Sequence, residues 1–220
     1  MHSLIVSILL FFQALSYAEI TRVTCIGDSI TEGGGCELGS YVDTLQDILG
    51  HQYSVFNAGV SSMTMLKQGL CNDLSPCSYW DTNAWSEAQL SNPDIVVIML
   101  GTNDAKSFNW EGIQQDTGDY YALDYVDLIQ TVQGLKSSPK VYIMVPPPLR
   151  SPYPFSMNAT VINEIFPTLV RNIASVTKVE IIDIFDALSG DDYSCDGCHP
   201  SNEGIQLIAE TVAKAIAPAK

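Results

Sequence analysis

Positively charged residues are scarce in this sequence of 220 residues. Its 10 Lys and Arg stand against 25 Asp and Glu, so the formal net charge is -15 at pH 7 and the isoelectric point lies near 4.2. A chain this acidic repels phosphate backbones and anionic lipid surfaces, and nucleic acid is therefore not an expected partner. Such a charge is typical of a protein that stays dissolved in an external medium.

Long apolar segments, internal repeats and low-complexity linkers are also missing after residue 18. No later segment is long and apolar enough to span a bilayer, so we expect no stable membrane insertion. The composition, 46% hydrophobic and 16% charged, is sufficient for one globular domain with a full core. We therefore expect a single domain over residues 19–220.

The first 18 residues have the pattern of a secretory signal peptide. An apolar run, Leu4–Leu10, continues through Phe12, and small residues then lead to Ala18, where cleavage before Glu19 is expected. The run is too short for a membrane anchor. We therefore expect a secreted protein, and in a eukaryotic secretory pathway the sequon at Asn158 would be a glycosylation site.

Six cysteines remain after removal of this signal, and an even number in a secreted chain favours disulfide bonds. The sequence does not fix their pairing. The pairs that are close in sequence, Cys71–Cys77 and Cys195–Cys198, are the ones we expect. Cys25 and Cys36 could pair with each other or stay free.

Apolar, β-branched runs alternate with helical patterns along the chain. We expect strands over residues 20–27, 53–59, 93–101, 140–148 and 179–185, and helices over 40–50, 124–136, 158–177 and 201–217. Alternation of this kind predicts a parallel sheet that is covered by helices on both faces. In such sheets, functional sites form outside the carboxyl ends of the strands.

Candidate site residues follow three of these strands. Ser29 comes after Gly27 at the end of the first strand, where its hydroxyl can be exposed and its own N–H can point into a site. Gly59 ends the second strand and could bring a bare N–H close to a ligand. Asn103 follows the third strand and offers a side-chain amide donor. Each residue alone is more often part of a turn, and the Gly-rich segment around Ser29 lacks the lysine and the spacing of a phosphate-binding loop.

One histidine is a strong candidate for a general base. His2 is removed with the signal, and His51 lies between a predicted helix end and a strand, a surface position. His199 follows the fifth strand, and a serine hydroxyl needs such a base to become a nucleophile. The base in turn needs an acid that fixes its tautomer, and Asp196 is three residues away. The rival acids are Asp183, Asp186, Asp191 and Asp192.

The motif Cys195-x-x-Cys198-His199 also fits other chemistries. It matches a c-type haem attachment site, a redox dithiol and half of a zinc site. These interpretations leave the candidate donors after the first three strands unexplained. We instead expect a Cys195–Cys198 disulfide, which would stiffen and preorganise the loop that carries Asp196.

Four short motifs occur in order over residues 27–200: Gly27-Asp28-Ser29, Gly59, Gly101-x-Asn103-Asp104 and Asp196-x-x-His199-Pro200. Together they resemble the four blocks of the SGNH (GDSL) hydrolases. The resemblance implies a flavodoxin-like, three-layer α/β/α sandwich with a five-stranded parallel sheet, and ester hydrolysis without a metal or other cofactor. It implies that the catalytic residues are Ser29 as nucleophile, His199 as base and Asp196 as orienting acid. The implied oxyanion hole consists of Ser29, Gly59 and Asn103, and Asp28 would be a structural partner in the turn.

The substrate is less closely defined by the sequence. The stretch 99–110, with Lys106, Asn109 and Trp110, and the prolines at 146–148 resemble the branch of this family that includes carbohydrate O-acetylesterases. No long apolar lid is present, which argues against a lipase for long acyl chains. Three aromatic side chains in loops at the active edge could stack on sugar rings or could simply cover the core: Trp110, Tyr153 and Phe155.

The sequence therefore predicts a secreted serine esterase that removes short acyl groups, with acetyl esters of carbohydrates as the first candidate. A lysophospholipase, thioesterase or arylesterase on the same scaffold is the main alternative. A secreted haem or redox protein is the alternative from another class. A binding module that has lost catalysis is disfavoured because the Ser-His-Asp set is intact.

Overall fold

The computed structural model describes residues 19–35, 39–114, 117–190 and 193–217. The predicted signal peptide, residues 1–18, lies outside these ranges, as do Cys36 and two of the rival acids, Asp191 and Asp192. None of the helices within the described ranges has both the length and the apolar character needed to cross a bilayer.

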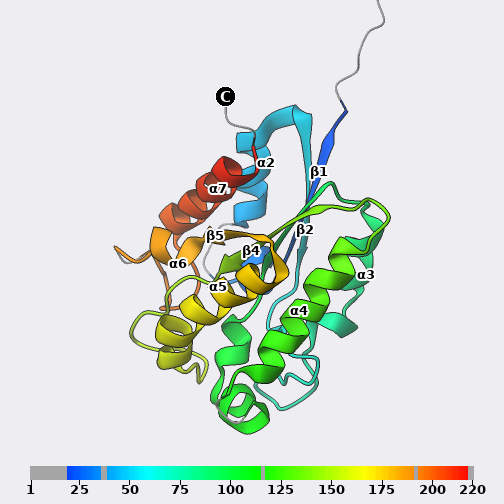
Figure 1. The fold of residues 1–220 in the computed structure, drawn as a ribbon. Coiled ribbons are helices and arrows are strands. Elements are labelled where there is room, and N and C mark those ends of the chain that lie inside the picture. Colours follow the sequence, from blue (N-terminus) through cyan, green and yellow to red (C-terminus); the bar gives the residue numbers. More distant parts are fainter. Residues whose placement is uncertain (1–18, 36–38, 115–116, 191–192, 218–220) are drawn as a thin grey trace, which may run out of the picture.

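A five-stranded parallel sheet forms the centre of the molecule, as the alternation of elements predicts (Figure 1). Its strands lie in the order β2-β1-β3-β4-β5, and their bounds are β1 (Thr21–Gly27), β2 (Tyr53–Gly59), β3 (Ile95–Met99), β4 (Lys140–Val145) and β5 (Glu180–Asp183). Every residue of β3 is buried, which fits a central strand with helices on both faces. Gly27 pairs with Gly59 on one side and with Met99 on the other, so the carboxyl ends of three strands meet at one edge.

Helices cover both faces of the sheet, which gives the predicted α/β/α layers (Figure 1). They are α1 (Ser29–Glu32), α2 (Tyr41–Leu49), α3 (Asn83–Leu90), α4 (Asp119–Gln133), α5 (Phe166–Thr177), α6 (Ile184–Ala187) and α7 (Asn202–Ile216). One buried cluster joins α2 and α7 to one face of the sheet, through side chains such as Leu45 and Val97. A second cluster joins α3, α4 and α5 to the other face, through side chains such as Trp85, Leu128 and Ile98.

The strand order places a topological switch point beside β1. The chain passes from β1 to β2 on one side and later enters β3 on the other side of β1. In sheets of this kind, a crevice forms at the carboxyl ends of the strands where the direction reverses. The segments that follow β1, β2 and β3 therefore meet where a site is expected.

Two helical regions differ from the sequence-based prediction. The sequence pattern does not predict α3, because only Trp85 and Ala88 of this helix are buried and its apolar periodicity is weak. The helix expected over 158–177 begins with a wider turn, Val161–Ile165, and continues as α5 from Phe166. Pro167 is accommodated because it lies in the first turn of α5, where its missing N–H costs no helical hydrogen bond.

Candidate active site

Ser29 stands where β1 gives way to α1. A Cβ on Gly27 would lie 2.6 Å from Thr31 Cβ, so only glycine fits this close turn. The buried side chain of Asp28 caps α1, and its Oδ1 accepts a hydrogen bond from Ile30 N at 3.0 Å. The cap fixes the turn that presents Ser29 at the carboxyl edge of the sheet.

Two hydrogen bonds join Ser29, His199 and Asp196. Ser29 Oγ lies 2.9 Å from His199 Nε2, and His199 Nδ1 lies 2.7 Å from Asp196 Oδ2. An ionised carboxylate only accepts hydrogen bonds, so the ring proton belongs on Nδ1, and Nε2 is left to accept from the serine hydroxyl. The structure thus brings together the three residues that the sequence singles out, one from the end of β1 and two from the loop before α7.

Asp196 is held in place by its own loop. Its Oδ1 accepts hydrogen bonds from Cys198 N at 2.9 Å and from His199 N at 2.7 Å. Burial raises the pKa of the Asp196 carboxyl, but the hydrogen bonds from the His199 ring and from these two N–H groups outweigh burial and lower the pKa overall. The carboxylate is therefore ionised beside the imidazole. The rival acids among the described residues form ion pairs with Arg171 instead: Asp183 and Asp186.

A pocket of about 230 Å³ is lined by Ser29 and His199. Gly35 lies against the imidazole that faces this pocket, since a Cβ on Gly35 would lie 2.5 Å from His199 Nδ1. The segments after α1, β2 and β3 contribute to the wall, as the topology of the sheet predicts. The lining residues are Ser29, Gly34, Gly35, Ser61, Ser62, Asn72, Asn103, Lys106, Phe155, Met157 and His199.

Asn103 brings a side-chain amide to this pocket. It lies in the short turn η3 (Thr102–Ala105) that follows β3, and it is buried. Its Nδ2 donates to Met63 O at 3.2 Å, and its backbone carbonyl accepts from Asn109 Nδ2 at 3.0 Å. An amide nitrogen carries two N–H groups, so the second N–H of Asn103 remains for a ligand in the pocket.

The N–H of Gly59 is not available to a ligand. It donates to Asn57 Oδ1 at 2.9 Å, and Gly59 does not line the pocket. The prediction that Gly59 contributes an oxyanion donor is therefore wrong. Glycine is required at this position for another reason, because a Cβ would lie 2.6 Å from the backbone carbon of Thr31 in α1.

Ser62 provides the N–H that Gly59 does not. The N–H groups of the neighbouring residues Val60, Ser61 and Met63 are all donated to protein acceptors. Within the described residues, Ser62 N has no such acceptor, and Ser62 lines the pocket. Its φ of 70° lies in the left-handed region that non-glycine residues seldom adopt. Sequence reasoning missed Ser62 for that reason, since a glycine is the usual signal for such a backbone position.

The sequence around these site residues matches a known protein family. The model of the GDSL-like Lipase/Acylhydrolase family matches residues 25–207, a range that includes Ser29, Asn103, Asp196 and His199. The chain belongs to this family.

Individual relatives of this GDSL-family chain include esterases. Over 215 residues it is 34% identical to an acetylxylan esterase of Xylanibacter ruminicola. The aligned region covers 90% of this chain and 43% of that protein. The chain therefore spans less than half the length of this relative. The inhibitor-bound aryl esterase of M. smegmatis has a TM-score of 0.68 at 24% identity, and a carbohydrate acetylesterase from Sinorhizobium meliloti has a TM-score of 0.66 at 23% identity. Each match covers 89% of this chain and 98% of the solved chain, and at these identities it shows the shared fold.

Asp104 ties the segment after β2 of this GDSL-family chain to the turn that carries Asn103. It is fully buried, and its two carboxyl oxygens accept hydrogen bonds from Met65 N at 2.9 Å and Leu66 N at 2.8 Å. Burial raises the pKa of Asp104 to about 7, although these two N–H groups act in the opposite direction. The contacts hold the segment that includes Ser62 in a fixed position relative to Asn103.

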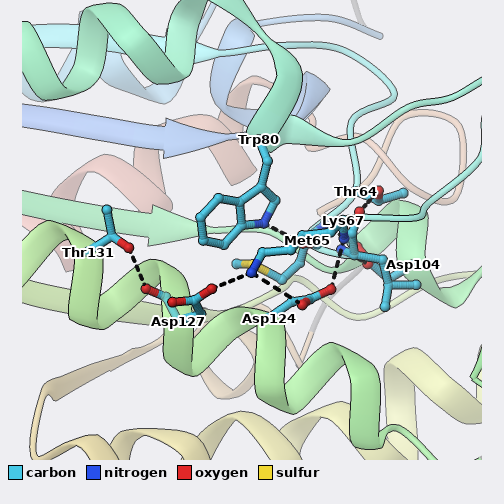
Figure 2. Close-up of polar contacts among 9 residues, drawn as sticks. Thr64, Met65, Lys67, Trp80, Asp104, Asp124, Asp127 and Thr131 are labelled. Atoms are coloured by element: carbon cyan, nitrogen blue, oxygen red, sulfur yellow. Dashed lines mark hydrogen bonds and ion pairs between the residues drawn. The ribbon is translucent and has the colours of Figure 1, made fainter.

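Lys67 extends this anchor to α4. Its N–H donates to Asp124 Oδ2 at 2.8 Å, and its ammonium contacts Asp127 and lies 4.3 Å from the ring centroid of Trp80 (Figure 2). Trp80 in turn donates from its indole Nε1 to Met65 O at 3.0 Å. The segment after β2 is therefore fixed at several consecutive residues.

The three aromatic candidates for substrate contact have different surroundings. Trp110 is only 1% exposed and packs edge to face on Phe166 in the core, so the prediction that it contacts substrate is wrong. Tyr153 is 56% exposed but does not line the pocket. Phe155 lines the pocket, and its ring centroid lies 5.8 Å from that of His199.

The cysteines follow the prediction in part. The Cys71–Cys77 disulfide is confirmed, with Cα atoms 5.2 Å apart. The predicted Cys195–Cys198 disulfide is wrong, because Cys198 is a free, buried thiol and Cys195 is disulfide-bonded elsewhere. Burial raises the pKa of Cys198 and keeps its thiol protonated, so a redox dithiol is not formed here. Cys25 is also free, and no group of three or more His, Cys, Asp or Glu in the described ranges could hold a metal ion.

Asn158, the residue of the predicted glycosylation sequon, is half-buried. Its Nδ2 lies 3.4 Å from Glu111 Oε1, and its Oδ1 accepts a hydrogen bond from Thr160 N at 3.1 Å. A glycan attached at Nδ2 would displace the contact with Glu111. Glycosylation at this position stays a prediction.

Proposed function

We propose that this protein is a serine esterase in which Ser29 is the nucleophile, His199 the general base and Asp196 the orienting acid. The observation that carries the proposal is the distance of 2.9 Å between Ser29 Oγ and His199 Nε2, with Asp196 at the other ring nitrogen. A serine hydroxyl is a weak nucleophile until a base removes its proton, and this arrangement provides the base and fixes its tautomer. Membership of an acylhydrolase family supports the same chemistry.

In the acylation step, Ser29 Oγ attacks the carbonyl carbon of the ester while its proton passes to His199 Nε2. The carbonyl π bond opens, and the carbonyl oxygen becomes an oxyanion. When the carbonyl re-forms, the bond from carbon to the alcohol oxygen breaks, and the Nε2 proton goes to that oxygen. An acyl-Ser29 ester and a free alcohol result. The Asp196 carboxylate stabilises the imidazolium while it exists.

Deacylation repeats the sequence with water as the nucleophile. His199 Nε2 takes a proton from water as the oxygen attacks the acyl carbon, and a second oxyanion forms. The bond from carbon to Ser29 Oγ then breaks, and the proton returns to the serine. The net reaction consumes one ester and one water and yields an alcohol and a carboxylic acid, which ionises near neutral pH.

Three donors support the oxyanion in both steps. They are the N–H of Ser29, the N–H of Ser62 and the second N–H of Asn103 Nδ2. All three residues line the pocket beside the nucleophile. Donors that are already fixed at the place where negative charge develops lower the barrier without reorganisation, which is the largest single term in many hydrolases.

We propose short acyl esters of carbohydrates as the substrate class, with acetyl first. The pocket of about 230 Å³ is smaller than pockets that hold drug-sized ligands, so it favours a short acyl group. Phe155 offers an aromatic face at the pocket wall on which a sugar ring could stack. The identity of 34% with an acetylxylan esterase supports the choice of acetyl and of carbohydrate.

We also propose that the protein is secreted. The apolar run and small residues that precede Glu19 support this, as does the Cys71–Cys77 disulfide, because structural disulfides persist in oxidising compartments.

A substrate panel tests the proposed substrate class. The purified protein would be given acetylated xylo-oligosaccharides and p-nitrophenyl esters with acyl chains of two to twelve carbons. We expect kcat/KM to fall steeply as the acyl chain lengthens, and we expect release of acetate from the oligosaccharides. Equal or better turnover of long-chain esters would overturn the short-acyl proposal and favour the lysophospholipase alternative. Turnover of aryl acetates without release of acetate from the sugars would favour an arylesterase.

A further inference from the structure

Lys106 is a buried cation in the candidate active-site pocket. It follows η3, it is only 2% exposed, and it lines the same pocket as Ser29 and His199. Lysine is almost never fully buried unless its ammonium is paired, because burial of an unpaired charge is costly. A buried ammonium in this position therefore calls for a negatively charged partner.

The described residues do not supply that partner. Among them, Lys106 forms no ion pair and no side-chain hydrogen bond. Burial lowers the pKa of Lys106, and the carboxyl groups of Asp28 and Asp104 act on it in the opposite direction. The two carboxyl groups are near enough to favour the charged ammonium but do not pair with it. Both Asp104 oxygens and Asp28 Oδ1 accept from backbone N–H groups instead, and Asp28 Oδ2 has no hydrogen-bond partner among the described residues.

Lys67 shows how the same chain satisfies an ammonium group when no ligand is needed. The Lys67 ammonium contacts Asp127, lies 3.8 Å from Asp124 Oδ1 and lies over the ring of Trp80 (Figure 2). Lys67 is also well exposed to water, whereas Lys106 is not. The difference sets Lys106 apart as a group whose partner comes from outside the chain.

We propose that Lys106 makes this pocket a binding site for a carboxylate anion. A carboxylate has two oxygens. One oxygen can occupy the oxyanion position and accept from Ser29 N, Ser62 N and Asn103 Nδ2, and the other can accept from the Lys106 ammonium. A hydrogen bond between ammonium and carboxylate is roughly twice as strong as one between neutral groups. This arrangement would satisfy the buried charge.

Two sources could supply such a carboxylate. One is the acid that ester hydrolysis produces, such as acetate. The other is the acidic group of a uronic acid within a carbohydrate substrate. Both present the same anion to the ammonium. The inference rests on the proposed function for the source of the anion, whereas binding of the anion itself does not require hydrolysis.

Calorimetric titration of the Ser29→Ala variant tests the proposal without turnover. The ligands are acetate and glucuronate, each beside a neutral analogue of similar size, acetamide and glucose. We expect at least one carboxylate to bind about tenfold more tightly than its neutral analogue. Preference for acetate over acetamide assigns the site to the product, and preference for glucuronate over glucose assigns it to an acidic substrate.

Substitution of Lys106 attributes the preference to this residue. In the Ser29→Ala background, Lys106→Met should remove the tenfold preference for the carboxylate and leave the affinity for the neutral analogue unchanged. Lys106→Arg should keep the preference, because it keeps the charge. Lys140→Met is the matched control, because it removes the same charge from an exposed lysine at the start of β4, outside the pocket, and should change neither affinity.

Several results would overturn the proposal. Equal affinity of carboxylate and neutral analogue in the Ser29→Ala protein would do so, as would a preference that survives Lys106→Met. A Lys106→Met protein that melts at a lower temperature but keeps the preference would assign Lys106 a structural role only. If Lys106→Met does not fold, the affinities for the carboxylate and for its neutral analogue are compared in the Ser29→Ala protein and in Lys106→Arg. Equal affinities in these proteins would overturn the proposal. Failure of the wild type to hydrolyse esters would refute the proposed function. It would not affect the conclusion on carboxylate binding, because that test does not require turnover.

Discussion

Ser29 Oγ and His199 Nε2 lie 2.9 Å apart although 170 residues separate them in the chain. The end of β1 supplies the serine, and the loop before α7 supplies the histidine. Asp196 holds the imidazole from its far side at 2.7 Å, and Gly35 allows close approach of the backbone to the ring. The fold therefore brings together a serine hydroxyl and an imidazole that no local segment contains.

Asp196→Asn should lower kcat by about 10²–10⁴-fold with little change in KM. An amide can neither fix the productive imidazole tautomer nor stabilise the imidazolium that forms in each step. Steady-state kinetics on p-nitrophenyl acetate measures the effect. Asp186→Asn is the control, because Asp186 pairs with Arg171 on the surface and should be dispensable. A wild-type rate in the Asp196→Asn protein would contradict the role of this acid.

Asn103→Ala should lower kcat on the order of 10²–10³-fold, because one donor to the oxyanion is lost. Asn72 lines the same pocket and carries the same amide, so Asn72→Ala is the matched control and should affect KM at most. Thermal melting of both variants separates loss of catalysis from loss of fold. Similar losses of kcat in the two variants would argue against a specific oxyanion role for Asn103.

Gly35→Ala should reduce kcat by about 10²-fold through displacement of His199. The added Cβ would lie 2.5 Å from His199 Nδ1, and the φ of 108° at Gly35 is unfavourable for alanine. Gly112→Ala is the control, because a Cβ there meets nothing within 4 Å. Unchanged kinetics in Gly35→Ala would mean that the imidazole tolerates displacement and that its position matters less than we propose.

Asp28→Asn should make the protein more stable relative to the wild type as the pH rises. Burial raises the pKa of Asp28 to about 6, whereas an unfolded Asp has a pKa of about 3.9. The contribution of this group to stability is therefore fully present below pH 4 or so and is lost as the pH rises through about 6. Asparagine keeps an acceptor for Ile30 N and carries no charge. The variant therefore does not lose stability through ionisation at this position as the pH rises. The side chain of Thr102 interacts with this carboxyl, and its hydroxyl can accept from the new amide.

Urea denaturation at several pH values measures this difference. The free energy of unfolding of Asp28→Asn minus that of the wild type should increase by roughly 3 kcal/mol between about pH 4 and pH 8, as two pKa units imply. Asp47→Asn, on the exposed side of α2, is the control for removal of a carboxyl that is not buried. A flat profile for Asp28→Asn as well would show that the buried carboxyl stays ionised.

The sheet and most helices were predictable because their signals are local and repeated. Each strand is a short apolar run, β3 is apolar on both faces, and α7 begins after Ser201, a residue type that is favoured as a helix cap. Ser29, Asp196 and His199 were predictable because histidine is scarce and because candidate residues follow the strands. α3 lacked such a signal, since its burial rests mainly on Trp85.

The remaining site features depend on three-dimensional contacts that the sequence does not display. Gly59 was predicted as a donor, but the side chain of Asn57 accepts its N–H. The donor that we propose in its place, Ser62, has a backbone angle that serine seldom adopts. Trp110 lies near the motif of Asn103 in sequence, yet the wide turn Phe108–Ile113 places it in the core. The Cys195–Cys198 disulfide was likewise predicted from proximity in sequence, but the thiol of Cys198 is free.

Labelling with a fluorophosphonate, followed by peptide mass spectrometry, identifies the nucleophilic serine. We expect a single label on Ser29 that is absent from Ser29→Ala and retained in Ser61→Ala and Ser62→Ala, which alter the two other serines of the pocket. Ester hydrolysis should fall by roughly 10³–10⁶-fold in Ser29→Ala alone. A label on another residue, or undiminished hydrolysis by a clean Ser29→Ala preparation, would show that Ser29 is not the nucleophile.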